Sequence, residues 1–197
     1  MNPATESCSV DDVEGRVVAV IARAMDVPVS EVSPSSSLEA DLGAQSLDYL
    51  DIAFSLEREF RIQFPRTDFL QRAGDHFGEE NLVKDGVVTP FGLKLLALGM
   101  PEIEPGQLKP GLRITDLQKM FTVATFIRVV RQLLESKTAM DRTCPNCKAE
   151  MVESSALPEF VCNACRTVVP VPSGDEVLFR HLLTVEQQAN DPSAGGS

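Results

Sequence analysis

Four cysteines toward the C-terminal end of the sequence have the spacing of a metal site. They form two C-x-x-C pairs, TCPNCK and VCNACR, with fourteen residues between the pairs. Thiolates on two such turns can converge tetrahedrally on one ion, which is the geometry that Zn(II) accepts with sulfur ligands. Because four sulfurs leave no open position for water, we expect a structural and not a hydrolytic metal, bound by Cys144, Cys147, Cys162 and Cys165.

Two other kinds of site use similar cysteines. A redox dithiol requires a thioredoxin-like strand and helix around one pair, and the sequence shows no such context. A rubredoxin-type iron site shares the four-sulfur geometry, although the segment lacks the aromatic cover typical of electron-transfer centres. The whole segment resembles a zinc ribbon over residues 141–172, with short strands expected in AEMVES, PEFV and RTVVPV.

A second candidate is a single serine, Ser46, which lies between a turn-like DLGAQ and the periodic run LDYLDIAFSLEREF. Serine at a helix N-terminus is often only the N-cap. The same position also favours an attached phosphate, because backbone N–H groups and the positive end of the helix dipole are free there. The chain has two histidines, and neither is near Ser46 in the sequence, so nothing supports a hydrolase triad. Ser46 is therefore expected to accept a group and not to act as a nucleophilic catalyst.

Composition limits the classes of partner. The 197 residues carry a formal net charge of −11 and a pI near 4.6, which disfavours nucleic acid. The candidate ribbon has four acidic against three basic residues in 141–170, so it too lacks a nucleic-acid footprint. We find neither a signal peptide nor an apolar run long enough to span a bilayer, and we expect a cytoplasmic protein without membrane insertion.

Apolar periodicity predicts the helices that would position Ser46. Residues 10–25 have helical spacing, and a long ordered loop is expected over 26–45. From Ser46 onward, Leu47, Leu50 and Phe54 are expected on one face of a helix. Acidic residues occupy another face of that helix, namely Asp48, Asp51 and Glu59.

These elements together resemble the acyl carrier protein family. The combination of D-L-G-A, S-L-D, an acidic helix and E-F-x-I-x-x-P in residues 41–65 carries the resemblance. It implies an all-α four-helix bundle, whose last helix would be FTVATFIRVVRQLLE at residues 121–135, with 4′-phosphopantetheine on Ser46. It also implies docking of a phosphopantetheinyl transferase and of acyl-transferring enzymes with basic patches on Asp48, Asp51 and Glu59, with Leu47, Leu50 and Phe54 shielding the acyl chain. The LDYLDIAFSLEREFRI run is especially similar to carriers of very long or unusual acyl chains.

The sequence departs from that family in two places. Gln45 precedes the serine where the family usually has an aspartate that helps to engage the transferase, so modification by a general transferase is in question. About fifty extra residues, roughly 66–114, then separate Pro65 from the TDLQKMF segment where the pattern resumes. The insertion is too apolar to be a linker. It is expected to form either a wall beside the second and last bundle helices or an enlargement of their core.

The sequence therefore predicts an acyl carrier domain over residues 1–140, a zinc ribbon over 141–172, and a C-terminal helix that covers the ribbon and precedes a disordered tail over 173–197. The predicted function is non-catalytic. Ser46 would carry acyl intermediates as thioesters on phosphopantetheine, in a specialised fatty acid or lipid pathway. The alternative is an unmodified interaction adaptor with a structural zinc ribbon.

Overall fold

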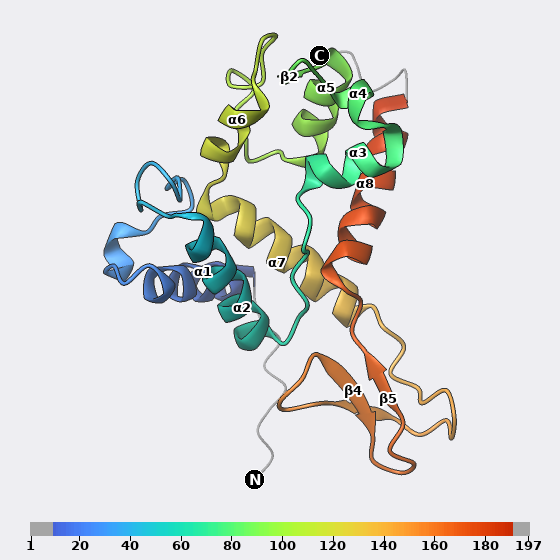
Figure 1. The fold of residues 1–197 in the computed structure, drawn as a ribbon. Helices are drawn as coiled ribbons and strands as arrows, with labels where there is room; N and C mark the ends of the chain where they lie inside the picture. The colour runs from blue at the N-terminus through green and yellow to red at the C-terminus, as the bar shows by residue number, and fades with distance from the viewer. Residues whose placement is uncertain (1–9, 191–197) are drawn as a thin grey trace.

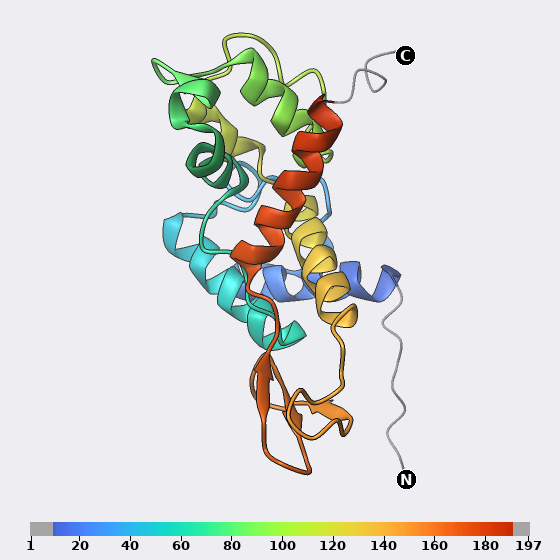
Figure 2. The same cartoon turned by 90° about the vertical axis from the view of Figure 1, so that its right-hand side faces the viewer.

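The computed structural model describes residues 10–190, and three hydrophobic cores follow one another along its length (Figure 1). A helical insertion lies at one end, a small β-sheet at the other, and three helices lie between them. Figure 2 shows that one long helix near the C-terminus runs from the sheet end to the insertion end, past the middle helices. The predicted disordered tail falls mostly in residues 191–197, outside the described part of the chain.

The first core is built by helices α1 (Val10–Ala24), α2 (Ser46–Phe60) and α7 (Val123–Thr138). Each contributes buried apolar residues at three- and four-residue spacing, such as Val17 and Ile21 of α1 and Ile52 and Leu56 of α2. The helices expected from periodicity over 10–25 and from Ser46 are confirmed, and so is the helix that the family resemblance implied over 121–135. Burial of these faces, rather than local propensity, is what holds such helices in place.

The loop between α1 and α2 is ordered, as predicted. It contains the short 3₁₀ helix η1 (Val29–Glu31), and its Leu38 side chain is fully buried in the first core. The Leu38 backbone N–H donates to the carbonyl of Phe121 at 3.3 Å, and Ser37 pairs with Thr122 in an isolated β-bridge. The loop that leads to Ser46 is therefore fixed to the segment that leads to α7.

The apolar stripe of α2 that was predicted from Leu47 onward does not enter the first core. Leu47, Leu50 and Phe54 were expected to shield a chain, but they are 75%, 51% and 48% exposed. The face that enters the core consists of Ile52, Ala53, Leu56 and Phe60. Helix α2 has two apolar stripes, and the stripe with Ile52, Leu56 and Phe60 is the one that meets α1 and α7. The other stripe is left on the surface.

The insertion folds into short elements with a second core of its own. These are α3 (Phe69–Phe77), α4 (Glu79–Leu82), β1 (Val83–Lys84), β2 (Val87–Val88) and α5 (Pro90–Gly99), followed by α6 (Ile114–Leu117) and η2 (Gln118–Met120). Asp68 caps α3 and Thr89 caps α5, with Pro90 in the first turn. The second core is separate from the first, so the insertion does not simply enlarge the first core.

Helix α8 (Gly174–Asn190) completes the second core, and the prediction that it covers the ribbon is wrong. Its buried Leu178, Leu182 and Val185 pack with α3 and α5. Its first residue, Gly174, lies against the backbone around Pro65 so closely that any side chain would collide with it. The apolar stripe of α8 was visible in the sequence, but its packing partner lies about a hundred residues earlier.

The third core belongs to the ribbon, a three-stranded antiparallel sheet of β3 (Met151–Glu153), β4 (Glu159–Cys162) and β5 (Val168–Pro170) in the order β3-β4-β5. The three strands lie where they were expected. With the β1–β2 pair of the insertion, the described residues are mainly helical with two small antiparallel sheets, and not all-α. None of the helices in residues 10–190 has both the length and the apolar character needed to cross a membrane.

Candidate functional site

Ser46 is the first residue of α2, and its side chain is exposed. The N-cap is Gln45, so the interpretation of Ser46 as a simple N-cap is wrong. The Asp48 carboxylate accepts a hydrogen bond of 2.7 Å from the backbone N–H of Gln45 and so stabilises this end of the helix. Gly43 has a φ of +70°, which favours glycine in the turn that delivers the serine. The Ser46 hydroxyl is thus presented to solvent at a helix N-terminus.

A cavity of about 530 Å³ opens beside Ser46. Its lining combines the helix start with Glu39 of the preceding loop, Tyr49 of α2 and Phe121 from the segment before α7. Burial, followed by the nearby Glu39 carboxylate, raises the pKa of Tyr49, so its hydroxyl stays neutral. Sequence reasoning did not identify Tyr49 or Phe121, because only the folded loop brings them to the serine.

The three predicted acidic docking residues lie in different environments. Asp51 is exposed on α2. Asp48 is half-buried and occupied in the helix cap, whereas Glu59 accepts hydrogen bonds of 3.0 and 2.9 Å from the guanidinium of Arg16 on α1. Asp51 is therefore the carboxylate of the three most readily offered to a basic partner.

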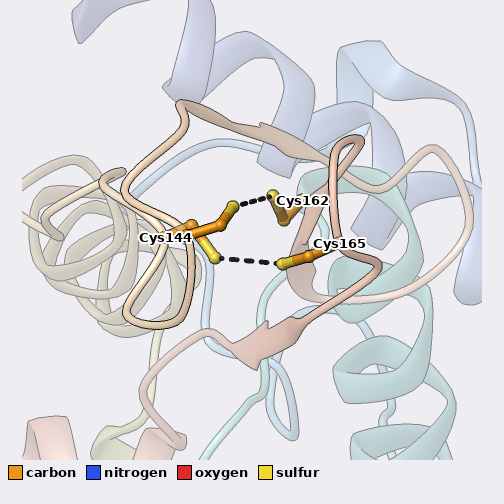
Figure 3. Close-up of side chains that lie close together, drawn as sticks. Cys144, Cys162 and Cys165 are labelled. Atoms are coloured by element: carbon orange, nitrogen blue, oxygen red, sulfur yellow. Dashed lines mark hydrogen bonds between the residues drawn. The ribbon is translucent and has the colours of Figure 1, made fainter.

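The four cysteine sulfurs converge at one end of the ribbon, and all lie within 4.8 Å of one another (Figure 3). The Sγ atoms of Cys144 and Cys165 are 3.5 Å apart, and those of Cys147 and Cys162 are 3.4 Å apart. Four sulfurs at about 2.3 Å from a tetrahedral zinc would be about 3.8 Å from one another. The structure thus brings together the cysteines that the spacing singled out, and they could hold a metal ion.

The two C-x-x-C turns have the same backbone geometry. The residue after each pair, Lys148 or Arg166, has a φ of 63° or 64°. In both turns its N–H donates to the carbonyl of the first cysteine, at 3.0 Å to Cys144 and 2.8 Å to Cys162. This repeated geometry turns the side chains of each pair toward the other pair, and it is a local reason for their convergence.

The donor set fits a cation chemically. Hydrogen bonds from Thr167 lower the pKa of Cys165 to about 6. The backbone N–H of Ala149 lowers the pKa of Cys147, but hydrogen bonds with the Cys162 and Cys165 sulfurs outweigh it and raise that pKa to about 12. Adjacent thiols thus share protons and do not all ionise together. A bound metal cation would supply the charge that lets all four act as thiolates.

Lys137, in the last turn of α7, connects the ribbon to α2, and sequence reasoning missed it. Its buried ammonium donates to the carbonyl oxygens of Phe60 and Arg61 at 3.1 and 3.2 Å. It also donates to the Glu153 carboxylate of β3 at 2.6 Å. The available signal was that Lys137 continues the apolar spacing of Val130 and Leu133, which places it on the buried face of α7.

Two comparisons with known proteins concern phosphopantetheine and acyl carriers. A family model described as a phosphopantetheine attachment site matches residues 15–74. Acyl carrier protein AcpXL of Mesorhizobium japonicum is 35% identical over 60 residues, which are 30% of this chain and 64% of that protein. The chain thus spans slightly less than two thirds of the length of that curated relative.

The match to the family model includes the DLGAQS turn that presents Ser46 and most of the α1 and α2 residues of the first core. Acyl carrier proteins are carriers and not enzymes, so the matches agree with the predicted non-catalytic role. Residues 15–74 of this chain are thus similar to phosphopantetheine attachment domains, and part of the chain is similar to an acyl carrier protein.

Proposed function

We propose that this chain is an acyl carrier protein whose Ser46 holds 4′-phosphopantetheine and carries acyl intermediates as thioesters, for a specialised fatty acid or lipid pathway. The observation that carries the proposal is an exposed serine hydroxyl at the first residue of α2, inside the segment that matches the attachment-site family. The helix N-terminus favours the phosphodiester electrostatically, and the 530 Å³ cavity leaves room for the arm beside it.

Attachment would require a phosphopantetheinyl transferase and coenzyme A. The Ser46 oxygen forms a new bond to the phosphorus that bears pantetheine, the pyrophosphate bond of coenzyme A breaks, and adenosine bisphosphate leaves. The serine proton passes to a base of the transferase. When bound, the group supplies a thiol for thioester formation; the protein positions that arm.

Helix α2 is the proposed docking surface for the transferase and for acyl-handling enzymes. Its exposed stripe of Leu47, Leu50 and Phe54 lies next to Asp51, which gives a partner both apolar area and negative charge. The charge would steer basic enzymes and orient them, and a small contact would allow rapid exchange. A cytoplasmic setting suits such a shuttle and keeps the four cysteines reduced for metal binding.

Intact-mass measurement after co-expression with the transferase of the native host tests the attachment. We expect the native chain and Ser55→Ala, a control on the same helix, to gain the mass of one phosphopantetheine. Ser46→Ala should gain nothing. Absence of the gain in the native chain would reject the carrier function.

That outcome would favour the second candidate, an unmodified adaptor. Gln45 is the observation behind it, since this position lacks the carboxylate that the family usually offers to the transferase. Gln45→Asp separates the two functions. A gain of modification in this variant, but not in the native chain, would show that residue 45 alone prevents attachment.

We also propose that Cys144, Cys147, Cys162 and Cys165 bind one structural zinc ion, with iron as the alternative. Metal analysis of the purified chain should find about one zinc per molecule. Cys162→Ser should lose it, because Cys162 is fully buried among the other ligands, whereas Cys8→Ser should keep it. A chelator should lower the midpoint of thermal unfolding of the native ribbon. Full occupancy by iron, or retention of zinc by Cys162→Ser, would contradict the assignment.

A further inference from the structure

A second cavity lies next to the cavity of Ser46, and the insertion builds most of it. It has a volume of about 350 Å³ and is lined by α3, α4, β1 and α6. This volume is within the roughly 300–1,000 Å³ of small-molecule sites. The two cavities share one residue, Phe121, which lines both. A group that extends from Ser46 past Phe121 therefore reaches the insertion.

The inner wall of the second cavity is apolar. Leu70, Leu82 and Leu117 form its floor, and each is at most 5% exposed. Val83 and Ile114 lie nearer the rim, and Ile114 is 38% exposed, so an apolar surface faces solvent there. Covering this surface with a hydrocarbon would be favourable.

The rim indicates which hydrocarbon suits the cavity. The carboxylates of Asp68 and Glu79 lie in its lining, and both residues are exposed. A free fatty acid would bring its own carboxylate toward this negative rim, which is unfavourable. An acyl chain held as a thioester is uncharged along its whole length. The cavity thus favours a tethered acyl chain over a free fatty acid.

The first core, in contrast, is closed by well-packed side chains. Val17 and Ile21 of α1, Ile52 and Leu56 of α2, and Val130 of α7 have no exposed surface at all. An acyl chain could enter between these helices only if they moved apart. The second cavity needs no such movement, because exposed residues such as Ile114 already line it and it shares Phe121 with the cavity of Ser46.

We propose that the insertion is an acyl-binding module: the chain of the thioester leaves Ser46, passes Phe121 and lodges in the cavity between α3, α4, β1 and α6. This inference rests on the proposed attachment of phosphopantetheine to Ser46. It gives the insertion a role in holding cargo, and it places that cargo outside the first core.

Photo-crosslinking tests the location of the chain. The modified protein is loaded with a long acyl chain that ends in a diazirine, irradiated and digested, and the labelled peptides are mapped by mass spectrometry. We expect labels in 68–83 and 114–121. Labels in the buried faces of α1, α2 and α7 would overturn the inference. So would a diazirine that reacts only with water and labels no peptide.

A cavity-filling variant provides the matched comparison. Ile114→Trp places a large ring at the open rim and should reduce insertion labelling more than about tenfold, since each methylene that loses burial costs about fourfold in occupancy. Val29→Trp adds the same ring at another exposed position, 55% exposed in the first loop, and should change nothing. Val83→Trp, on another wall, should repeat the effect of Ile114→Trp. Equal labelling in all four proteins would also overturn the inference.

The mass of each protein before loading separates the two proposals. If Ser46 gains no phosphopantetheine, the carrier function fails and this inference fails with it. If the mass increases normally but the label is found elsewhere, the carrier function stands and only the insertion's role is rejected.

Discussion

Single side chains join the three cores at the residue scale. The partly buried ion pair of Arg128 with Glu102, at 3.0 Å, connects α7 to the insertion. Lys137 connects the same helix to the ribbon through Glu153, and to the C-terminal end of α2 through two carbonyl oxygens. Asp175 of α8 accepts hydrogen bonds from Thr67 at the start of the insertion. Each of these polar groups has a partner in a neighbouring core. Such contacts fix the orientation of the cores relative to one another more than they add to stability.

Lys137→Met should destabilise the junction of α2, α7 and the ribbon. The change leaves two carbonyl oxygens and a carboxylate without their donor, at an expected cost of about 1–3 kcal/mol. Urea unfolding monitored by circular dichroism measures the loss. Lys119→Met is the control: its ion pair with Asp116 is exposed and should contribute much less to stability. Equal costs for the two variants would contradict the role assigned to Lys137.

His181 of α8 should make the second core sensitive to acid. It shares a hydrogen bond of 2.9 Å with the carbonyl of Gly99, and burial lowers its pKa below the usual 6.5. The nearby Arg128 also lowers that pKa, whereas Gly99 and Glu102 raise it. The unfolded state therefore takes up a proton at a higher pH than the folded state, and stability falls as the pH drops through about 6.5.

The measurement is the free energy of unfolding of the native protein and of His181→Gln between pH 7.5 and 5. The glutamine can still donate to the Gly99 carbonyl but does not titrate. Other ionisable groups are common to both proteins, so the variant should lose less stability on acidification. An identical pH dependence in both proteins would show that His181 does not titrate in this way.

At the scale of elements, sequence periodicity identified helices well and their neighbours poorly. Helices α1 and α2, the three ribbon strands and the cysteine cluster follow from local patterns of apolar spacing and C-x-x-C turns, and α7 follows from the resemblance to the carrier family. Local patterns do not show which apolar stripe of α2 is buried, because Leu47, Leu50 and Phe54 have the same spacing as a core face. The choice depends on where α1 and α7 lie, and no local pattern contains that information.

The site was predictable to a similar degree. The DLGAQS turn was enough to single out Ser46, and spacing alone singled out the four cysteines. The cavity walls were not predictable, because Tyr49, Phe121 and Ile114 become neighbours of the serine only through the folded loop and the insertion. The role of α8 was missed for the same reason: its partners α3 and α5 are remote in sequence.

At the scale of the whole molecule, α7 and α8 connect the first core, the insertion and the ribbon. Helix α7 belongs to the first core, and its Arg128 contacts the insertion while its Lys137 contacts the ribbon. Helix α8 begins at Gly174, beside Pro65, and runs to the side of α5 (Figures 1 and 2). The insertion depends on α8 for a large part of its apolar contacts, since Leu178, Leu182, Val185 and Ala189 are all buried in the second core.

A chain that ends at Ser173 should therefore lose the fold of the insertion. Each of the four buried side chains contributes about 1.5–3 kcal/mol, except for the smaller alanine, and a unit of this size cannot spare them all. Hydrogen exchange should show fast exchange across residues 69–100 and slow exchange retained in α1, α2 and α7. A chain that ends at Asn190 keeps α8 and should retain protection throughout. Continued protection of α3 and α5 in the shorter chain would refute this dependence.

The late position of α8 also has a consequence during synthesis. A ribosome makes α3 and α5 first, then α7 and the ribbon, and only afterwards the helix that finishes the core of the insertion. The apolar faces of α3 and α5 therefore remain exposed while a large part of the chain is translated. This interval is when a nascent chain is most prone to aggregate, so a chaperone that recognises exposed leucines would find its substrate here.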